Sequence, residues 1–175
     1  MRHLVLLRHA EAEAARPAQG DFERALTAQG RAQARAAGER LRQLSVFPDL
    51  LLSSPAERAR LCAQIVARVL GYLQPIDYQP ALYQAAAPAL LATLLRCAAP
   101  AQTLLLVAHN PGLSELAHRL AAAVQLVQAQ VVGVRGTAGL GKDSSFMLGT
   151  AELCRLEFDI GQWSELQVYC TEQKQ

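Results

Sequence analysis

Two arginines and two histidines, placed in three separate segments, have the chemistry of a phosphoryl-binding site. Arg8 and His9 are adjacent, and Arg58 and His109 follow much later in the chain. Guanidinium groups present rigid, planar donors that match phosphoryl oxygens. A neutral imidazole, whose ordinary pKa is ~6.5, is a competent nucleophile near neutral pH, and its attack on phosphorus leaves the phosphoryl group on nitrogen. We therefore predict His9 as a nucleophile and His109 as a second donor to the transferring oxygens.

Each of the three segments directly follows a short aliphatic run, which predicts a strand buried on both faces. The runs are residues 4–7, 49–52 and 103–107. In a doubly wound sheet the carboxyl ends of such strands lie side by side, so the segments can converge. After the second run, Ser54 and Pro55 predict the start of a helix, which puts Arg58 in its first turn.

The remaining pattern predicts an α/β fold with a mostly parallel sheet, in one domain over residues 1–175. Thr27 is a natural N-cap for an Ala-rich helix that ends near Leu44. Ile76 to Leu82 is expected to be extended, and the glycine-rich stretch from Gly133 to Ser145 predicts a flexible loop. Further predicted helices cover residues 88–98 and 112–124, and further predicted strands cover residues 152–158 and 165–169.

The composition argues against several partner classes. The chain has 17 basic and 15 acidic residues, and a net charge of +2 gives no general field for nucleic acid. No run reaches the ~18 apolar residues of a membrane span, and residue 1 leads straight into the first strand, so we expect no membrane partner and a cytoplasmic location. The four cysteines are widely spaced without a histidine pair beside them, so we expect free thiols and no metal or cofactor.

Four motifs in this order are similar to those of the histidine phosphatase superfamily, the phosphoglycerate-mutase-like proteins. They are Leu6-Leu7-Arg8-His9-Ala10, Leu26-Thr27-Ala28-Gln29-Gly30, Ser53-Ser54-Pro55-Ala56-Glu57-Arg58-Ala59 and Val107-Ala108-His109-Asn110-Pro111-Gly112. The resemblance implies a three-layer α/β/α sandwich and a cofactor-independent phosphatase. It implies that Arg8, His9, Arg58 and His109 form the phosphate pocket, with His9 phosphorylated in the cycle.

Other features of the chain resemble the bacterial phosphohistidine phosphatase branch of that superfamily. The chain is short and lacks an insertion after the first helix. Asp21 and Arg24 resemble a recurrent pair at the rim of the pocket, and the helix start near Asn110 offers backbone donors to a substrate. The substrate implied is phosphohistidine on a partner protein, with a phosphorylated small metabolite as the alternative.

The chain departs from mutases and small-molecule phosphatases at the leaving-group acid. Between Tyr78 and Lys142 it holds one acidic residue, Glu115, inside the helix after His109. Expelling an alkoxide needs a proton donor, whereas an imidazole with an ordinary pKa of ~6.5 takes its proton from water beforehand. This difference favours phosphohistidine as the substrate. Glu11 and Glu13 are the remaining candidate acids, and they could instead orient Arg8 or face solvent.

Three alternative interpretations accompany this hypothesis. Cys62 and Arg68 have the spacing of a cysteine-dependent phosphatase, but they lie within a helical pattern, where the amides are already bonded to the chain. Residues 136–142 nearly match a nucleotide-binding P-loop, but Asp143 stands where Ser or Thr would hold magnesium. A non-catalytic module could also hold a phosphorylated ligand in the same pocket.

Overall fold

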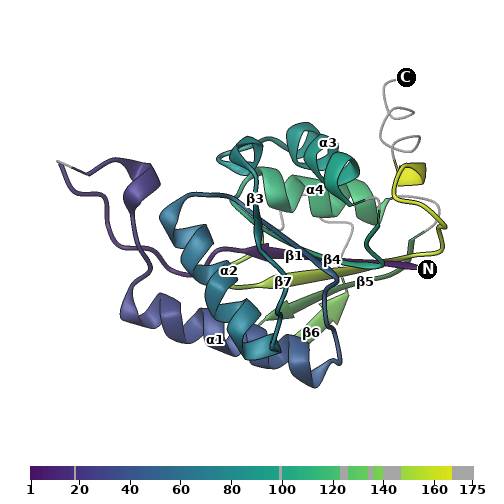
Figure 1. Cartoon of the computed structure of the whole chain (residues 1–175), viewed down its shortest axis with the longest axis horizontal. Helices are drawn as coiled ribbons and strands as arrows, with labels where there is room; N and C mark the ends of the chain where they lie inside the picture. Colours follow the sequence, from purple (N-terminus) through teal and green to yellow (C-terminus); the bar gives the residue numbers. More distant parts are fainter. Residues whose placement is uncertain (18, 99, 123–125, 134–135, 140–146, 167–175) are drawn as a thin grey trace.

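The computed structural model of this chain describes residues 1–17, 19–98, 100–122, 126–133, 136–139 and 147–166 (Figure 1). It contains a seven-stranded sheet with the order β3-β2-β4-β1-β7-β5-β6. The strands are β1 (Arg2–Arg8), β2 (Leu50–Ser53), β3 (Asp77–Tyr78), β4 (Thr103–Ala108), β5 (Leu126–Gly133), β6 (Gly136–Gly139) and β7 (Leu153–Phe158).

The sheet is mixed and mostly parallel. β3, β2, β4 and β1 run in one direction, and β7 is antiparallel to both β1 and β5. In register, Arg8 at the end of β1 lies beside Ala108 at the end of β4, and Ser53 at the end of β2 lies beside Val107. The three aliphatic runs therefore end at one edge of the sheet, as the sequence predicts.

Helices cover both faces of the sheet (Figure 1). They are α1 (Ala28–Gln43) and α2 (Glu57–Leu70) on one face, and α3 (Ala87–Cys97) and α4 (Gly112–Ala121) on the other. Along β1, Val5 and Leu7 join the core under α1 and α2, while Leu4 and Leu6 join the core under α3 and α4. Alternate side chains enter opposite cores, so the strand has no polar face. The three-layer α/β/α sandwich is confirmed.

The helix starts near the site have local causes. Thr27 Oγ1 accepts the Gly30 amide at 2.8 Å, which confirms it as the N-cap of α1. α2 begins at Glu57, two residues later than Ser54 and Pro55 predict, because the Ser54 amide still bonds to β4 through the Val107 carbonyl at 3.0 Å. Arg58 nevertheless lies in the first turn of α2.

Other boundaries differ from the sequence predictions. Only Asp77–Tyr78 of the expected extended segment pairs as a strand, and Pro80–Leu82 forms a short 3₁₀ helix. α4 ends at Ala121, and residue 124 lies outside the described residues. The predicted flexible loop is wrong where it is described, because Gly133 ends β5 and Gly136–Gly139 forms β6. Backbone pairing with β5 supplies this strand, and a glycine-rich composition gives no sign of it. Residues 134–135 and 140–145 lie outside the described part.

The predicted strand at 165–169 is wrong at its first two residues, which are helical. The carboxylate of Glu165 accepts the amides of Gly161 and Gln162 at 3.0 and 2.7 Å, and this capping contact favours a helical turn over an extended chain. Residues 167–169 lie outside the described part.

Candidate active site

Arg8 and His9 emerge from the carboxyl end of β1. The His9 amide donates to the Ala108 carbonyl at 3.1 Å, so β4 holds the chain at this point. Arg8 Nη1 donates to the Leu148 carbonyl at 2.8 Å. Burial lowers the pKa of Arg8 and the Glu152 carboxylate raises it, and the group stays a cation. Arg8 Nε is buried and has no hydrogen-bond partner among the described residues, so its N–H is available to donate a hydrogen bond to an anion.

The two nitrogens of His9 have different roles. Nδ1 donates to the Ala10 carbonyl at 2.8 Å, and because a carbonyl only accepts, the proton of the neutral ring is on Nδ1. Nε2 then has a lone pair and accepts Arg58 Nε–H at 3.2 Å. Burial, together with the charge of Arg58, lowers the pKa of His9 to about 4. His9 is therefore a neutral imidazole with Nε2 available as a nucleophile.

Arg58 comes from the first turn of α2 and is buried. Its Nη1 and Nη2 donate to the backbone carbonyl and the carboxylate of Asp21 at 2.5 and 2.8 Å. Asp21 begins the 3₁₀ helix Asp21–Glu23, in the long segment between β1 and α1 that extends from the body of the molecule in Figure 1. This ion pair ties that segment to α2.

Asp21 is the centre of a hydrogen-bond cluster. Arg24 Nη1 donates to its Oδ1 at 2.7 Å, and the Tyr83 hydroxyl and the Gln84 amide donate to Oδ2 at 2.9 and 3.2 Å. Burial acts to raise the pKa of Asp21, but the donors from Tyr83, Arg24 and Arg58 outweigh it and hold the pKa well below its usual range. Asp21 is therefore a carboxylate at every pH at which the chain is expected to work.

His109 follows β4 and is buried beside His9, with ring centroids 5.0 Å apart. Its Nε2 lies 2.7 Å from Ser54 Oγ, and that hydroxyl accepts the Ala56 amide at 3.3 Å. The hydroxyl proton is thus directed to Nε2, which favours the tautomer with a proton on Nδ1. Nδ1 is buried without a partner in the described part of the chain. Burial, with the nearby charge of Arg58, lowers the pKa of His109 to about 3.

Asn110 is linked to Arg8 through a shared backbone carbonyl. Its Nδ2 donates to the Leu148 carbonyl at 2.8 Å, and its Oδ1 accepts Ser114 Oγ–H at 2.8 Å. The Leu148 amide in turn donates to Ser114 Oγ at 2.9 Å. Because Arg8 bonds to the same carbonyl, this ring of hydrogen bonds links the start of α4 to the end of β1.

The two candidate acids are directed elsewhere. Glu11 Oε1 accepts the Thr27 hydroxyl at 2.8 Å, so its carboxylate supports the start of α1. Glu13 Oε2 lies 3.5 Å from Arg16 Nη2, and the Glu13 carbonyl accepts Arg24 Nε–H at 2.7 Å. The structure therefore brings six of the predicted site residues together, namely Arg8, His9, Asp21, Arg24, Arg58 and His109. Asn110 is linked to Arg8 through the Leu148 carbonyl, which accepts a hydrogen bond from both side chains.

Comparisons with known proteins identify the family. A model of the histidine phosphatase superfamily (branch 1) matches residues 4–89. A crystal structure assigned as the phosphohistidine phosphatase SixA of Agrobacterium tumefaciens is 31% identical, with a TM-score of 0.64, over 68% of this chain and 76% of that one. This chain belongs to the histidine phosphatase superfamily.

Two further relatives extend the comparison. An uncharacterized protein of Picosynechococcus sp. is 34% identical over 67% of this chain and 75% of its own length. A tungstate complex of the protein histidine phosphatase SixA shares the fold, with a TM-score of 0.69 over 94% of this chain and 99% of that one, at 18% identity. The fold is thus shared with this SixA structure over most of the length of both chains.

Sequence reasoning missed the contacts that three side chains make in the cluster. It assigned no role to Tyr83 or Gln84, and the structure shows both bonded to Asp21. It treated Ser54 as a helix cap, whereas the hydroxyl also contacts His109. A signal for Ser54 was present, since a serine directly after a buried strand at the same edge as two histidines lies within reach of them. Nothing local in the sequence links Tyr83 to Asp21.

The alternative motifs do not form their predicted sites in the described residues. Cys62 lies in the middle of α2, where burial raises the pKa of its thiol to about 12. Gly136–Gly139, the start of the near P-loop, is strand β6, and residues 140–143 lie outside the described part. Across the described ranges, no three metal-ligating side chains come together, and no helix is both long and apolar enough to cross a membrane.

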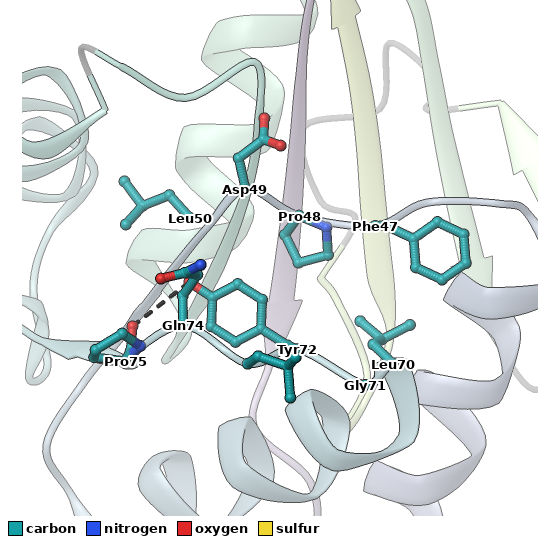
Figure 2. Close-up of a pocket in the computed structure, with 10 residues that line it drawn as sticks. Phe47, Pro48, Asp49, Leu50, Leu70, Gly71, Tyr72, Gln74 and Pro75 are labelled. Atoms are coloured by element: carbon teal, nitrogen blue, oxygen red, sulfur yellow. Dashed lines mark hydrogen bonds between the residues drawn. The ribbon is translucent and has the colours of Figure 1, made fainter.

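A separate hollow of about 670 Å³ lies at the start of β2 (Figure 2), whereas His9 follows the opposite, carboxyl end of the parallel strands. It is formed where the chain enters β2 and where it leaves α2, and it is lined by Phe47, Pro48, Asp49, Leu50, Leu70, Gly71, Tyr72, Leu73, Gln74 and Pro75. Its one carboxylate, Asp49, accepts the amides of Gln102 and Thr103. This hollow therefore offers no set of groups for catalysis.

Proposed function

We propose that this member of the histidine phosphatase superfamily removes phosphate through a phosphohistidine intermediate on His9, and that its substrate is phosphohistidine on a partner protein. The observation that carries the proposal is the state of His9. Its Nδ1 proton is bonded to the Ala10 carbonyl, so the nucleophilic lone pair is on Nε2, at the centre of a group of positive donors. The histidine needs no general base to become reactive.

The surrounding side chains match the needs of phosphoryl transfer. Arg8 and Arg58 can bind phosphoryl oxygens, and the Nδ1–H of His109 can donate to an oxygen as charge spreads over it. His9 Nε2 forms a bond to phosphorus while the bond from phosphorus to the leaving group breaks, and the bonding pair goes to the leaving atom. Water then attacks phosphorus and gives phosphate and free His9. These steps use only side chains and water.

The choice of phosphohistidine rests on the surroundings of the leaving group. The side chains after the 3₁₀ helix Pro80–Leu82 are Tyr83 and Gln84, and both donate to Asp21. Glu11 contacts Thr27 at the start of α1. A phosphoramidate needs no carboxylic acid to depart, because imidazole is a far better leaving group than alkoxide. The relatives assigned as SixA phosphohistidine phosphatases support the same choice.

Release of inorganic phosphate from two substrates tests the proposal. A phosphohistidine-bearing phosphotransfer protein and p-nitrophenyl phosphate are compared, with the wild type and His9→Ala, in buffer without added metal. We expect fast loss of phosphate from the phosphoprotein, slow ester hydrolysis, and neither reaction in His9→Ala. Acid-labile radioactive phosphate trapped on the wild-type chain, and absent from His9→Ala, would identify the intermediate.

Other outcomes would point to other functions. Preference for p-nitrophenyl phosphate would favour a phosphomonoesterase that acts on a small metabolite. Binding of the phosphoprotein without turnover, with similar affinity in His9→Ala, would favour a non-catalytic module. Loss of turnover in His9→Ala with retained binding separates an enzyme from that module, because Arg8, Arg58 and His109 remain to hold the phosphoryl group.

A further inference from the structure

Asp21 puts a negative charge at a site whose other charged side chains suit an anion, and this charge is unfavourable for a bound phosphoryl dianion. Its Oδ2 is separated from the nucleophile, His9 Nε2, only by the guanidinium of Arg58. The cluster around Asp21 keeps it ionised. A carboxylate so close to the reaction repels a dianionic phosphoryl group and attracts a positive charge. The carboxylate of Asp21 therefore favours a substrate that carries a positive charge close to it.

The location of Asp21 is on the outer side of the site. Its side chain is 37% exposed, whereas that of Arg58 is 6% exposed, so the ion pair runs from the buried interior to the surface. The neighbouring Phe22 is 40% exposed, and its ring packs edge-on against Tyr83 with centroids 5.1 Å apart. The Tyr83 ring in turn packs against His109 at 5.6 Å. Asp21 thus lies in an aromatic rim next to the catalytic histidines.

The geometry of transfer puts the leaving group toward this rim. Attacking and leaving atoms lie roughly in line on opposite sides of phosphorus. His9 follows β1, and its Nε2 faces Arg58, which in turn bonds to the partly exposed carboxylate of Asp21, so the side of phosphorus opposite His9 lies toward Asp21. The 3₁₀ helix Asp21–Glu23 and Tyr83 form the described surface at this point. An aromatic rim beside a carboxylate suits a flat ring that carries positive charge.

We propose that Asp21 is a specificity-determining residue that selects a substrate whose phosphorylated imidazole ring is protonated on its other nitrogen, so that the leaving group is a neutral imidazole. This inference rests on the proposed function and names the form of its substrate. In the transfer step, His9 Nε2 bonds to phosphorus and the phosphorus–nitrogen bond of the substrate breaks. The bonding pair stays on the substrate nitrogen, and the proton already on the other ring nitrogen stays there, so a neutral imidazole departs without a separate acid.

The same charge acts against an ester. A departing phenolate or alkoxide gains negative charge, and Asp21 repels it. The charge of Asp21 is offset in the resting protein by the side chains that face it, which are Arg24, Arg58, Tyr83 and Gln84. Because electrostatic potentials add, removing that one negative charge still makes the potential at the site more positive. At a distance of roughly 8 Å and an effective dielectric constant of about 20, the Coulomb energy of one unit charge is reduced further by solvent screening. The remaining energy changes the ratio of the phosphohistidine rate to the ester rate by about tenfold.

The test is the ratio of kcat/KM for free phosphohistidine to kcat/KM for p-nitrophenyl phosphate. Asp21→Asn keeps the shape and most hydrogen bonds of the side chain and removes its charge. The ratio cancels any change in the position of Arg58, because both substrates need that residue. We expect the ratio to fall by about tenfold in Asp21→Asn. Glu23→Gln is the matched control, since it removes one charge from the exposed end of the same 3₁₀ helix, and its ratio should stay at the wild-type value.

A second readout is the pH profile. Turnover of phosphohistidine should fall as the pH rises through the pKa of the bound substrate ring, because the ring must be protonated to leave. Asp21 raises that pKa, so the alkaline limb should move to lower pH in Asp21→Asn, while the profile for p-nitrophenyl phosphate should not show this shift. If Asp21→Asn does not fold, Asp21→Ser provides a second neutral side chain for both measurements.

The failures of the two proposals are distinguishable. A wild-type chain that does not hydrolyse phosphohistidine overturns the proposed function and this inference together, before any variant is made. A wild type that prefers phosphohistidine, combined with equal losses on both substrates in Asp21→Asn, overturns this inference alone and leaves Asp21 as a positioning residue for Arg58. An unchanged alkaline limb would count against it in the same way.

Discussion

Ser54→Ala is the change that most directly tests how the buried imidazole of His109 is prepared. The hydroxyl lies 2.7 Å from His109 Nε2 and accepts the Ala56 amide. The alanine would remove both contacts and leave Nε2 buried without a donor, because His109 is only 4% exposed. The same change would remove the reason for the proton of His109 to be on Nδ1, the nitrogen that is buried without a partner in the described part of the chain.

The expected magnitudes follow from these two losses. An unsatisfied buried acceptor costs about 1–3 kcal/mol, so the free energy of unfolding should fall by about 2 kcal/mol. In the variant, Nδ1 would present a lone pair to the phosphoryl oxygen in a large part of the molecules. Loss of one preorganised donor to a transition-state oxygen lowers kcat by roughly 100-fold, and because the ring can still change tautomer, we expect a fall of about 10- to 100-fold.

The neighbouring serine provides a matched control. Ser53 is equally buried, but its hydroxyl donates to the Ser54 carbonyl at 2.9 Å and does not contact the histidine. Ser53→Ala should therefore lose about 1 kcal/mol of stability and keep its kcat. Steady-state kinetics on the phosphohistidine substrate, together with urea unfolding of both variants, separates the effect on catalysis from the effect on folding.

Three results would contradict this reasoning. If Ser54→Ala kept the wild-type kcat, the tautomer of His109 would not depend on the hydroxyl. If Ser53→Ala and Ser54→Ala lost kcat equally, the loss would come from packing at the end of β2. A variant in which kcat falls while stability is unchanged would contradict the cost assigned to the buried nitrogen.

Two further predictions concern protons and thiols. Burial lowers the pKa values of His9 and His109 to about 4 and about 3, whereas histidines of the unfolded chain titrate near ~6.5. Protonation therefore favours the unfolded chain as the pH falls from ~6.5 toward 4, and thermal melts should show a smaller loss of stability over this range in His109→Asn than in the wild type. Asp21 does not add to the loss in this window, because its carboxylate is ionised in both states above its ordinary pKa of ~3.9. The thiol of Cys62 lies inside α2 with its pKa raised to about 12, so Cys62→Ala should keep the phosphatase turnover, and a large loss would revive the cysteine-dependent alternative.

The central strands of the fold could be predicted because burial on both faces produces a recognisable pattern in the sequence. A strand that contributes to two cores needs an uninterrupted aliphatic run, and β1 and β4 both show one. The residues at the ends of these runs followed from the geometry of parallel sheets. The pairing of β5 with β6 gives no such sequence pattern, because the glycines of β6 contribute backbone hydrogen bonds but no side chains.

The side chains of the site also differ in how well the sequence predicts their convergence. His9, Arg58 and His109 are attached to the ends of regular elements, so their convergence follows from the order of strands β2, β4 and β1. Asp21, Tyr83 and Gln84 meet through connecting segments whose paths depend on contacts far apart in the chain, and the sequence could suggest Asp21 only by resemblance. Under the proposed function, the side chains that would position phosphorus are thus carried by the sheet, while those that would face the leaving group are carried by the connections. Substitutions at the strand ends should lower turnover of every substrate, and substitutions in the connections should change which substrate is preferred.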